Sequence, residues 1–376
     1  MSAAPLMPPP PMPPPLKPPG RDARLDAIRG WLQLSIFASH IAGGFVGGWL
    51  IHAAWGVSDS SEQFVFLSGF GLGSVFLYKQ ARQGFAAACR DMAVRFARLW
   101  RMHLVVFLGF GAMVTAGAAW LGTPGWDYAM RHPVLAALGG TLLVYQPPFM
   151  GILPMFLIGM AALLPFLWLV ARFEARALLM PAALYVAAQL LPADLPALGG
   201  TSFAFSPPGW VPLFLLGAWF GRRVLFTGRA VTADRRLVAG ALAIVALGTV
   251  LKVTGTLPGW LVGKEQLAPL RALHALSLAY LVAALVPRAA AWTGTRLSAA
   301  LGMIGRHSLP VFSLGLFLSW LGSVAVARNP LLEVIVVPAG AFILWALARS
   351  LDARRLGAGA PAAAPHMLAT GKGPSA

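Results

Sequence analysis

The sequence predicts an all-α membrane protein, a polytopic bundle of about ten transmembrane helices with one additional re-entrant or short segment. Three observations support this fold class. The chain has 376 residues, of which 58% are hydrophobic and only 11% are charged, whereas soluble domains carry about 25% charged residues. Apolar runs long enough to cross a hydrocarbon core of about 30 Å recur along the chain. The basic residues are concentrated between these runs, as expected for cytoplasmic loops.

The apolar runs divide the chain into a membrane domain and two tails. Residues 1–20 are rich in proline, and residues 356–376 in glycine, alanine and proline, so both are expected to be disordered. Residues 21–355 are expected to form the membrane domain. Its predicted spanning helices cover residues 29–50, 62–79, 102–121, 149–170, 178–192, 208–225, 237–255, 270–288, 307–325 and 331–349. The run 133–145 is too short to span comfortably and precedes two prolines, which indicates a re-entrant segment or a bent helix.

The distribution of lysine and arginine predicts the orientation in the membrane. With ten spans and both termini in the cytoplasm, all but five of the 29 basic residues fall in cytoplasmic segments. The exceptions are Arg131, Lys252, Lys264, Arg271 and Arg328. The net charge of +17 is therefore attributed to membrane orientation and not to nucleic-acid binding.

The cytoplasmic segment 79–101 has a pattern of its own. Its apolar residues recur at steps of three and four among several arginines. This pattern predicts an amphipathic helix that lies on the inner leaflet and contacts anionic lipid. The alternative is that the arginines hold the phosphates of a cytoplasmic donor.

Arg29 and His40 are the first candidates for a functional site. They are eleven residues apart on the first predicted helix, which places them on nearly the same face, about 16 Å apart along the axis. An ionisable residue near the middle of a membrane is costly and is a functional candidate by default. A structural histidine bonded to a neighbouring helix is the alternative for His40.

Further candidates lie at the ends of other predicted helices. Asp59 and Glu62 precede the second helix, where they are either site carboxylates or a capping box. Arg271 and His274, three residues apart, share a helix face on the outer side. Arg271 is interpreted as part of an interior anion site or as an interfacial anchor. The last set comprises Ser68 in the second helix and Arg306 and His307 at the inner start of another.

Several kinds of site are excluded by their missing motifs. The sequence has no metal-spaced set of histidine, cysteine and acidic residues and no GxSxG elbow, so no bound metal or cofactor is expected. Gly69, Gly71 and Gly73 fall inside a predicted spanning helix, where small residues indicate close packing and not phosphate binding. Isolated histidines with arginine partners fit general-base catalysis or proton-coupled transport.

Four sequence blocks together resemble the OpgC family of the transmembrane acyltransferase superfamily. They are residues 24–30, which start the R-x10-H pattern of Arg29 and His40, and residues 58–69, 267–274 and 305–312. The resemblance implies succinyl transfer to osmoregulated periplasmic glucans in the bacterial inner membrane. It implies that Arg29, His40, Asp59, Glu62, Arg271 and His274 are site residues, with Ser68, Arg306 and His307 in supporting positions. Four positions depart from the family pattern. Ser39 and Gly151 stand where the family usually has aspartate, Ser206 where it has asparagine, and Val211 where it has glutamine.

The expected activity is O-acyl transfer from a cytoplasmic acyl-CoA, in particular succinyl-CoA, to a hydroxyl of a periplasmic glucan. His40 would remove the hydroxyl proton, and Arg29 would hold donor phosphates. Arg271 would bind a donor carboxylate or position the acceptor. A covalent variant would use Ser35 or Ser68. The competing functions are a transporter or flippase for an anionic or acylated substrate, and an acyltransferase acting on another envelope polysaccharide or a lipid-linked sugar.

Overall fold

The computed structural model describes residues 22–191, 195–255, 257–288 and 290–359, with side chains described as far as Arg355. The predicted tail 1–20 lies outside the described residues, as does most of the predicted tail 356–376. The regular structure is helical, as predicted, and the described residues contain one isolated antiparallel bridge between Pro196 and Ser202. The helices are α1 Ala23–Ser39, α2 Ser60–Gln83, α3 Phe85–Leu121, α4 Asp127–Arg131, α5 Pro133–Thr141, α6 Ile152–Phe173, α7 Leu179–Leu190, α8 Pro207–Thr227, α9 Arg235–Thr254, α10 Gly259–Val262, α11 Pro269–Leu285, α12 Arg296–Arg306, α13 Ser308–Arg328 and α14 Glu333–Gly359.

Five segments of the described chain are long and apolar enough to cross a membrane by length and composition. They are Phe85–Leu121, Ile152–Leu190, Arg235–Thr254, Ser308–Arg328 and Pro330–Arg355. Helices α1 and α11 have 17 residues each, which is about 26 Å at 1.5 Å per residue and shorter than a typical hydrocarbon core. The predicted count of about ten spans therefore stays a prediction.

The prediction of one continuous helix over residues 29–50 is wrong for the second half of that range. α1 ends at Ser39, and the chain continues through a turn, a π-helical segment Val46–Leu50 and a 3₁₀ turn His52–Ala54. The physical reason is the glycine content of this stretch, because Gly43 has a φ of 78°, a left-handed value that a helix cannot continue through.

The amphipathic segment 79–101 does not form a separate helix. Apart from its first residues, which belong to α2, it is the beginning of α3, a continuous helix of 37 residues from Phe85 to Leu121. At 1.5 Å per residue α3 is about 55 Å long, so its basic first half extends beyond a hydrocarbon core of about 30 Å. The short predicted segment 133–145 is represented by α5, whose nine residues are too few to span.

Helices α2 and α8 pack with their backbones in close contact. A Cβ atom on Gly69 would lie 1.9 Å from the carbonyl oxygen of Phe214, and one on Gly217 would lie 2.1 Å from that of Phe66. A Cβ atom on Gly73 would lie 2.7 Å from the Cβ of Ala218. These contacts confirm that Gly69 and Gly73 serve helix packing, in the small-xxx-small manner of membrane helices, whereas Gly71 faces the side chain of Arg29 on α1.

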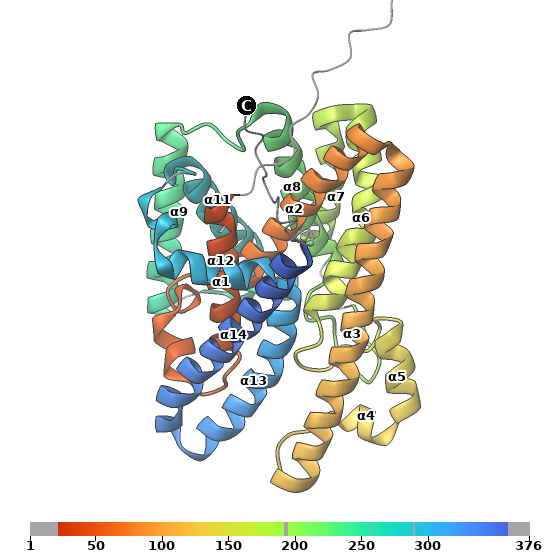
Figure 1. The fold of residues 1–376 in the computed structure, drawn as a ribbon, viewed down its shortest axis with the longest axis vertical. Coiled ribbons are helices and arrows are strands. Elements are labelled where there is room, and N and C mark those ends of the chain that lie inside the picture. Colours follow the sequence, from red (N-terminus) through yellow and green to blue (C-terminus); the bar gives the residue numbers. More distant parts are fainter. Residues whose placement is uncertain (1–21, 192–194, 256, 289, 360–376) are drawn as a thin grey trace, which may run out of the picture.

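Figure 1 shows α3 at one side of the bundle, α9 at the other, and α1, α2, α8 and α11 between them. The outer helices expose large apolar side chains, such as Leu242 and Val253 on α9 and Val105 on α3. An apolar surface of this kind is suited to lipid and not to water. The central helices carry the polar residues that form the candidate site.

Candidate functional site

Four charged side chains form an ion-pair cluster where α2 and α11 begin. Lys264 Nζ and Arg271 Nη2 each lie 2.7 Å from Oδ2 of Asp59. Arg271 also donates from Nε to Oε1 of Glu62. The Glu62 side chain is fully buried and that of Arg271 is 11% exposed. Arg271 therefore lies in the interior, and its guanidinium has two carboxylate partners from the protein itself. Its role in binding a substrate anion stays a prediction.

Asp59 and Glu62 also form the capping box of α2. The side chain of Asp59 accepts a hydrogen bond from the backbone N–H of Ser61 at 2.7 Å, and Oε2 of Glu62 accepts one from the backbone N–H of Asp59 at 2.8 Å. The capping-box interpretation is therefore confirmed, and each carboxylate uses one oxygen for the helix end and the other for the cations. Their role as site carboxylates stays a prediction.

The cations keep Asp59 ionised. Burial would raise the pKa of its carboxyl group, but Lys264 and Arg271 outweigh burial and hold this pKa well below its usual range. Asp59 is therefore a carboxylate at any physiological pH.

His274 lies beside this cluster in a closely packed position. It is 2% exposed, and its Nδ1 is 2.7 Å from the hydroxyl of Ser58. Glycines at two positions make room for the ring, because a Cβ on Gly56 would lie 2.7 Å from its Cε1 and one on Gly248 would lie 2.5 Å from its Cδ2. The Nε2 of His274 is buried without a hydrogen-bond partner among the described residues.

His40 is the C-cap residue of α1. Its Nδ1 lies 2.7 Å from the carbonyl oxygen of Ile36, and its ring packs against Phe149 with centroids 5.4 Å apart. A proton on Nδ1, donated to that carbonyl, leaves Nε2 as a proton acceptor. The exposed Ser39 places its hydroxyl 3.4 Å from the same Nδ1, at the position where the resembling family has an aspartate.

Arg29 and Ser68 do not contact the ion-pair cluster. Arg29 donates from Nη2 to the carbonyl oxygen of Leu67 at 2.6 Å, which ties α1 to α2. The hydroxyl of Ser68 donates to the carbonyl of Phe64 within α2. The structure thus places Arg29 against the middle of α2, and the hydroxyl of Ser68 is engaged within its own helix.

Arg306 and His307 form a separate cluster with α14. Arg306 contacts both carboxylate oxygens of Asp352, with Nη2 2.6 Å from Oδ2 and Nε 3.2 Å from Oδ1. His307 Nε2 lies 3.3 Å from Oδ1 of the same residue. The structure gives these two candidates an ionic link to α14, and within the described part of the chain they form no hydrogen bond or ion pair with the residues around Arg271.

Sequence reasoning did not single out His52, Ser58 or Lys264 as site residues. His52 lies in the 3₁₀ turn that follows α1, and both of its ring nitrogens are buried without a hydrogen-bond partner among the described residues. His52 could have been recognised as a candidate from the sequence, because it lies within the apolar run 49–54. The predicted helix 29–50 ends before it, and the histidine chosen within that helix was His40.

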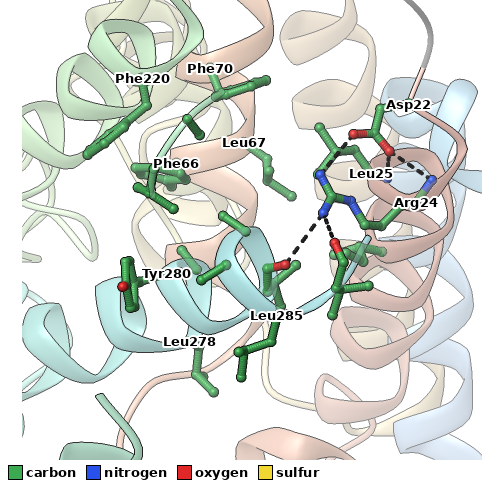
Figure 2. Close-up of a pocket in the computed structure, with 18 of the residues that line it drawn as sticks. Asp22, Arg24, Leu25, Phe66, Leu67, Phe70, Phe220, Leu278, Tyr280 and Leu285 are labelled. Carbon is green, nitrogen blue, oxygen red and sulfur yellow. Dashed lines mark hydrogen bonds and ion pairs between the residues drawn. The ribbon is translucent and has the colours of Figure 1, made fainter. Parts of the chain in front are cut away.

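A cavity of about 1120 Å³ lies between α1, α2, α8 and α11. Figure 2 shows Asp22 and Arg24 on one side of it and the aromatic side chains of Phe66, Phe220 and Tyr280 on the other. His52 also lines the cavity, whereas His40 and His274 do not. The part of the chain that the structure describes contains no group of three or more histidine, cysteine or acidic residues arranged to hold a metal ion.

The fold and the site define a helical membrane protein with buried imidazoles and an ion-pair cluster in which the Glu62 side chain is buried and that of Arg271 is nearly buried. The chain belongs to the OpgC family, because the family described as OpgC protein matches residues 21–355. This match covers nearly all of the described residues and confirms the resemblance noted in the sequence. Membership implies an acyltransferase-type function in a membrane. The chain matches no curated protein and no solved structure.

Proposed function

We propose that the protein is an inner-membrane O-acyltransferase that moves a succinyl group from cytoplasmic succinyl-CoA to a hydroxyl of a periplasmic glucan. The observation that carries the proposal is the family match across residues 21–355. The buried imidazoles and the ion-pair cluster of Asp59, Glu62, Lys264 and Arg271 support it, because ionisable groups inside a membrane domain mark functional sites. Both chain termini lie in the cytoplasm in this proposal, as the basic residues predict.

His40 acts as the general base in the proposed reaction. Its Nε2 removes the proton of the acceptor hydroxyl while the hydroxyl oxygen attacks the thioester carbonyl carbon. The carbon–sulfur bond then breaks, and the carrier leaves as a thiol with the proton from His40. The hydrogen bond between Nδ1 and the Ile36 carbonyl supports this role, because it orients the ring and favours the tautomer with a basic Nε2.

The ion-pair cluster positions the acceptor. Lys264 is the most accessible of its cations, with a side chain that is 39% exposed, and it also lies 5.5 Å from the ring of Phe205. Sugar hydroxyls and rings bind well to such a combination of charge and aromatic surface. Arg271 holds the two carboxylates in place, since its guanidinium is occupied by them.

The test is ester formation by the purified full-length protein. Radiolabelled succinyl-CoA and unsubstituted glucan are incubated with the protein in lipid vesicles, and the glucan is examined for label that mild alkali removes. Labelled ester supports the proposal. Movement of a substrate across the vesicle membrane without any ester contradicts it and supports a transporter. If the ester forms only when a lipid-linked sugar or another envelope polysaccharide is supplied, the acceptor belongs to that class and is not a periplasmic glucan.

A further inference from the structure

The cavity between α1, α2, α8 and α11 is large for a small-molecule site. Its volume of about 1120 Å³ exceeds the range of about 300–1,000 Å³ that is usual for such sites. α11 lines the cavity from Leu276 to Val286, which is about 15 Å along the helix axis. α8 lines it from Leu216 to Val224, which is about 12 Å. An occupant that fills this space must therefore be long as well as large.

The walls of the cavity are mainly hydrocarbon. Phe66 and Phe70 line it from α2, and Phe220 lines it from α8. The rings of Phe66 and Phe220 lie together, with centroids 6.0 Å apart (Figure 2). On α11 the lining includes the small side chains of Ala279 and Ala283. Walls of this kind favour a hydrocarbon chain, because each methylene group that leaves water stabilises the complex.

Three polar side chains that line the cavity keep their polar atoms away from it. Gln63 Nε2 donates at 3.0 Å to the carbonyl oxygen of Ala275, and the hydroxyl of Tyr280 donates at 3.2 Å to that of Thr232. Both ring nitrogens of His52 are buried. The amide groups of a pantetheine arm, which carries an acyl thioester, would find few partners on such walls, and a buried amide without a partner is costly. A hydrocarbon chain carries no such cost.

Three arginines line the cavity at the ends of helices. Arg24 lies at the start of α1, Arg229 follows α8 and Arg288 follows α11. Asp22 is the one carboxylate in the described lining, 3.0 Å from Arg24 and 3.6 Å from Arg288. The Arg288 side chain is 59% exposed, and the Arg229 guanidinium forms no hydrogen bond or ion pair within the described chain. Both are therefore available to an anion such as a phosphate.

The predicted orientation places these three helix ends on the cytoplasmic side of the membrane. The cytoplasmic leaflet carries anionic lipids, and basic pockets between membrane helices on this side bind their headgroups. Three arginines and one carboxylate leave the lining with an excess of positive charge. The charge of the cavity is therefore complementary to an anionic headgroup, and its walls are complementary to the attached acyl chains.

We propose that the cavity binds an anionic phospholipid of the inner leaflet, with the phosphate at Arg229 and Arg288 and an acyl chain along the apolar walls. The lipid fills the space beside α11, the helix that carries Arg271 and His274, and so stabilises the position of this helix. This inference goes beyond the proposed acyl transfer and does not depend on it.

The acyl-chain contact is tested by lipid binding to the delipidated full-length protein. Native mass spectrometry measures the Kd for phosphatidylglycerol, with one bound lipid expected per chain. Ala279→Phe places a ring in the cavity and is expected to raise this Kd by about tenfold or more, the effect of losing contact with about two methylene groups. Ala243→Phe is the matched control, because Ala243 is exposed on α9 and does not line the cavity. Its Kd is expected to match that of the wild type.

The headgroup contact is tested with arginine variants at exposed positions. Arg229→Gln and Arg288→Gln are each expected to raise the Kd for phosphatidylglycerol about fivefold, the effect of one basic residue near an anionic surface. Arg235→Gln is the control, because Arg235 is exposed and does not line the cavity. Diacylglycerol has the same chains without the phosphate. It is expected to bind the wild type more weakly than phosphatidylglycerol does, and to bind all three variants as it binds the wild type.

Thermal unfolding provides a second measurement on the same proteins. A ligand that binds only the folded state raises the unfolding temperature. Phosphatidylglycerol is therefore expected to raise the unfolding temperature of the wild type and of Ala243→Phe, and to leave that of Ala279→Phe unchanged.

Three results would overturn the lipid site. Equal Kd values for Ala279→Phe and Ala243→Phe would place the bound lipid outside the cavity. Equal binding of phosphatidylglycerol and diacylglycerol to the wild type would remove the phosphate contact. Displacement of the bound lipid by an equimolar amount of succinyl-CoA would assign the cavity to the thioester donor. None of these measurements uses ester formation, so a protein that forms no ester contradicts the proposed function and leaves the test of the lipid site intact.

Discussion

Arg271 and Glu62 form an ion pair inside the helix bundle, although they are 209 residues apart in the chain. The Glu62 side chain is fully buried, and the Arg271 side chain is 11% exposed. Removing one partner of such a pair leaves an uncompensated buried charge, which costs far more than the pair itself contributes.

Arg271→Leu is therefore expected to destabilise the protein by about 3–5 kcal/mol and to abolish acyl transfer. Thermal unfolding of the detergent-solubilised protein checks the first effect, and ester formation checks the second. Arg131→Leu is the control, because Arg131 is exposed and contacts only the carbonyl of Asp127, so a change within about 0.5 kcal/mol is expected. Equal unfolding temperatures for the two variants would contradict the structural role of the pair.

Asp59→Asn is expected to lower activity at every pH between 5 and 8, because Asp59 is ionised across this range. The pKa of Asp59 is depressed, so its stabilising contribution is complete above the unfolded pKa, about 3.9, and is lost only as the pH falls through the lower folded pKa. Activity profiles of wild type and variant across this range provide the measurement. An acidic limb near pH 5 that is present in the wild type and absent from the variant would show that Asp59 titrates there.

His40→Ala is expected to lower the rate of ester formation by about 10²–10⁴-fold while the protein stays folded, because a general base contributes that much. The hydrogen bond between Nδ1 of His40 and the Ile36 carbonyl is local to the C-terminal end of α1. Its loss therefore has a small effect on folding. Ester formation and the thermal unfolding temperature are measured on the same preparation. Unchanged acylation by this variant would remove His40 from the mechanism.

Gly69→Ala is expected to destabilise the protein by about 1–3 kcal/mol, as overpacking of a closed contact does. The added methyl group would lie 1.9 Å from the Phe214 carbonyl oxygen, so α2 and α8 must separate. Gly240→Ala on α9 is the matched control, because nothing lies within 4 Å of the added Cβ. The control is expected to be neutral or up to about 1 kcal/mol more stable, and unfolding temperatures compare the two.

The predicted orientation is tested by labelling single cysteines in intact cells. The background is Cys89→Ser, which removes the one cysteine of the chain. Thr201→Cys, between α7 and α8, is expected to react with a membrane-impermeant maleimide added outside the inner membrane. Thr227→Cys, at the end of α8, is expected to react only after cell disruption. Both positions are exposed in the structure, so the reverse result would invert the orientation.

Much of the fold could be predicted because it depends on local patterns. Apolar runs mark α9, α13 and α14, and the capping box of Asp59 and Glu62 marks the start of α2. The break after Ser39 was missed because the apolar run continues to residue 50 and glycine is common in membrane helices, so residues 29–50 were predicted to form one helix. Gly43 instead takes a left-handed conformation.

The site was predictable as a set of residue types but not as a set of contacts. Arg29, Asp59, Glu62, Arg271 and His274 stood out because ionisable residues are rare in apolar segments. Their pairing was not predictable, since Asp59 and Arg271 are 212 residues apart and no local periodicity relates them. The same limit explains why the ion pair of Arg306 with Asp352 on α14 was not predicted.

The double use of Asp59 and Glu62 has a consequence for how the chain enters the membrane. The start of α2 is synthesised about two hundred residues before Lys264 and Arg271, so both carboxylates reach the bilayer before their cations exist. A carboxylate without a partner is costly in hydrocarbon, so this end of α2 must remain in contact with water or the insertion machinery until α11 arrives. Both cations then arrive together, because Lys264 and Arg271 are seven residues apart around the start of α11.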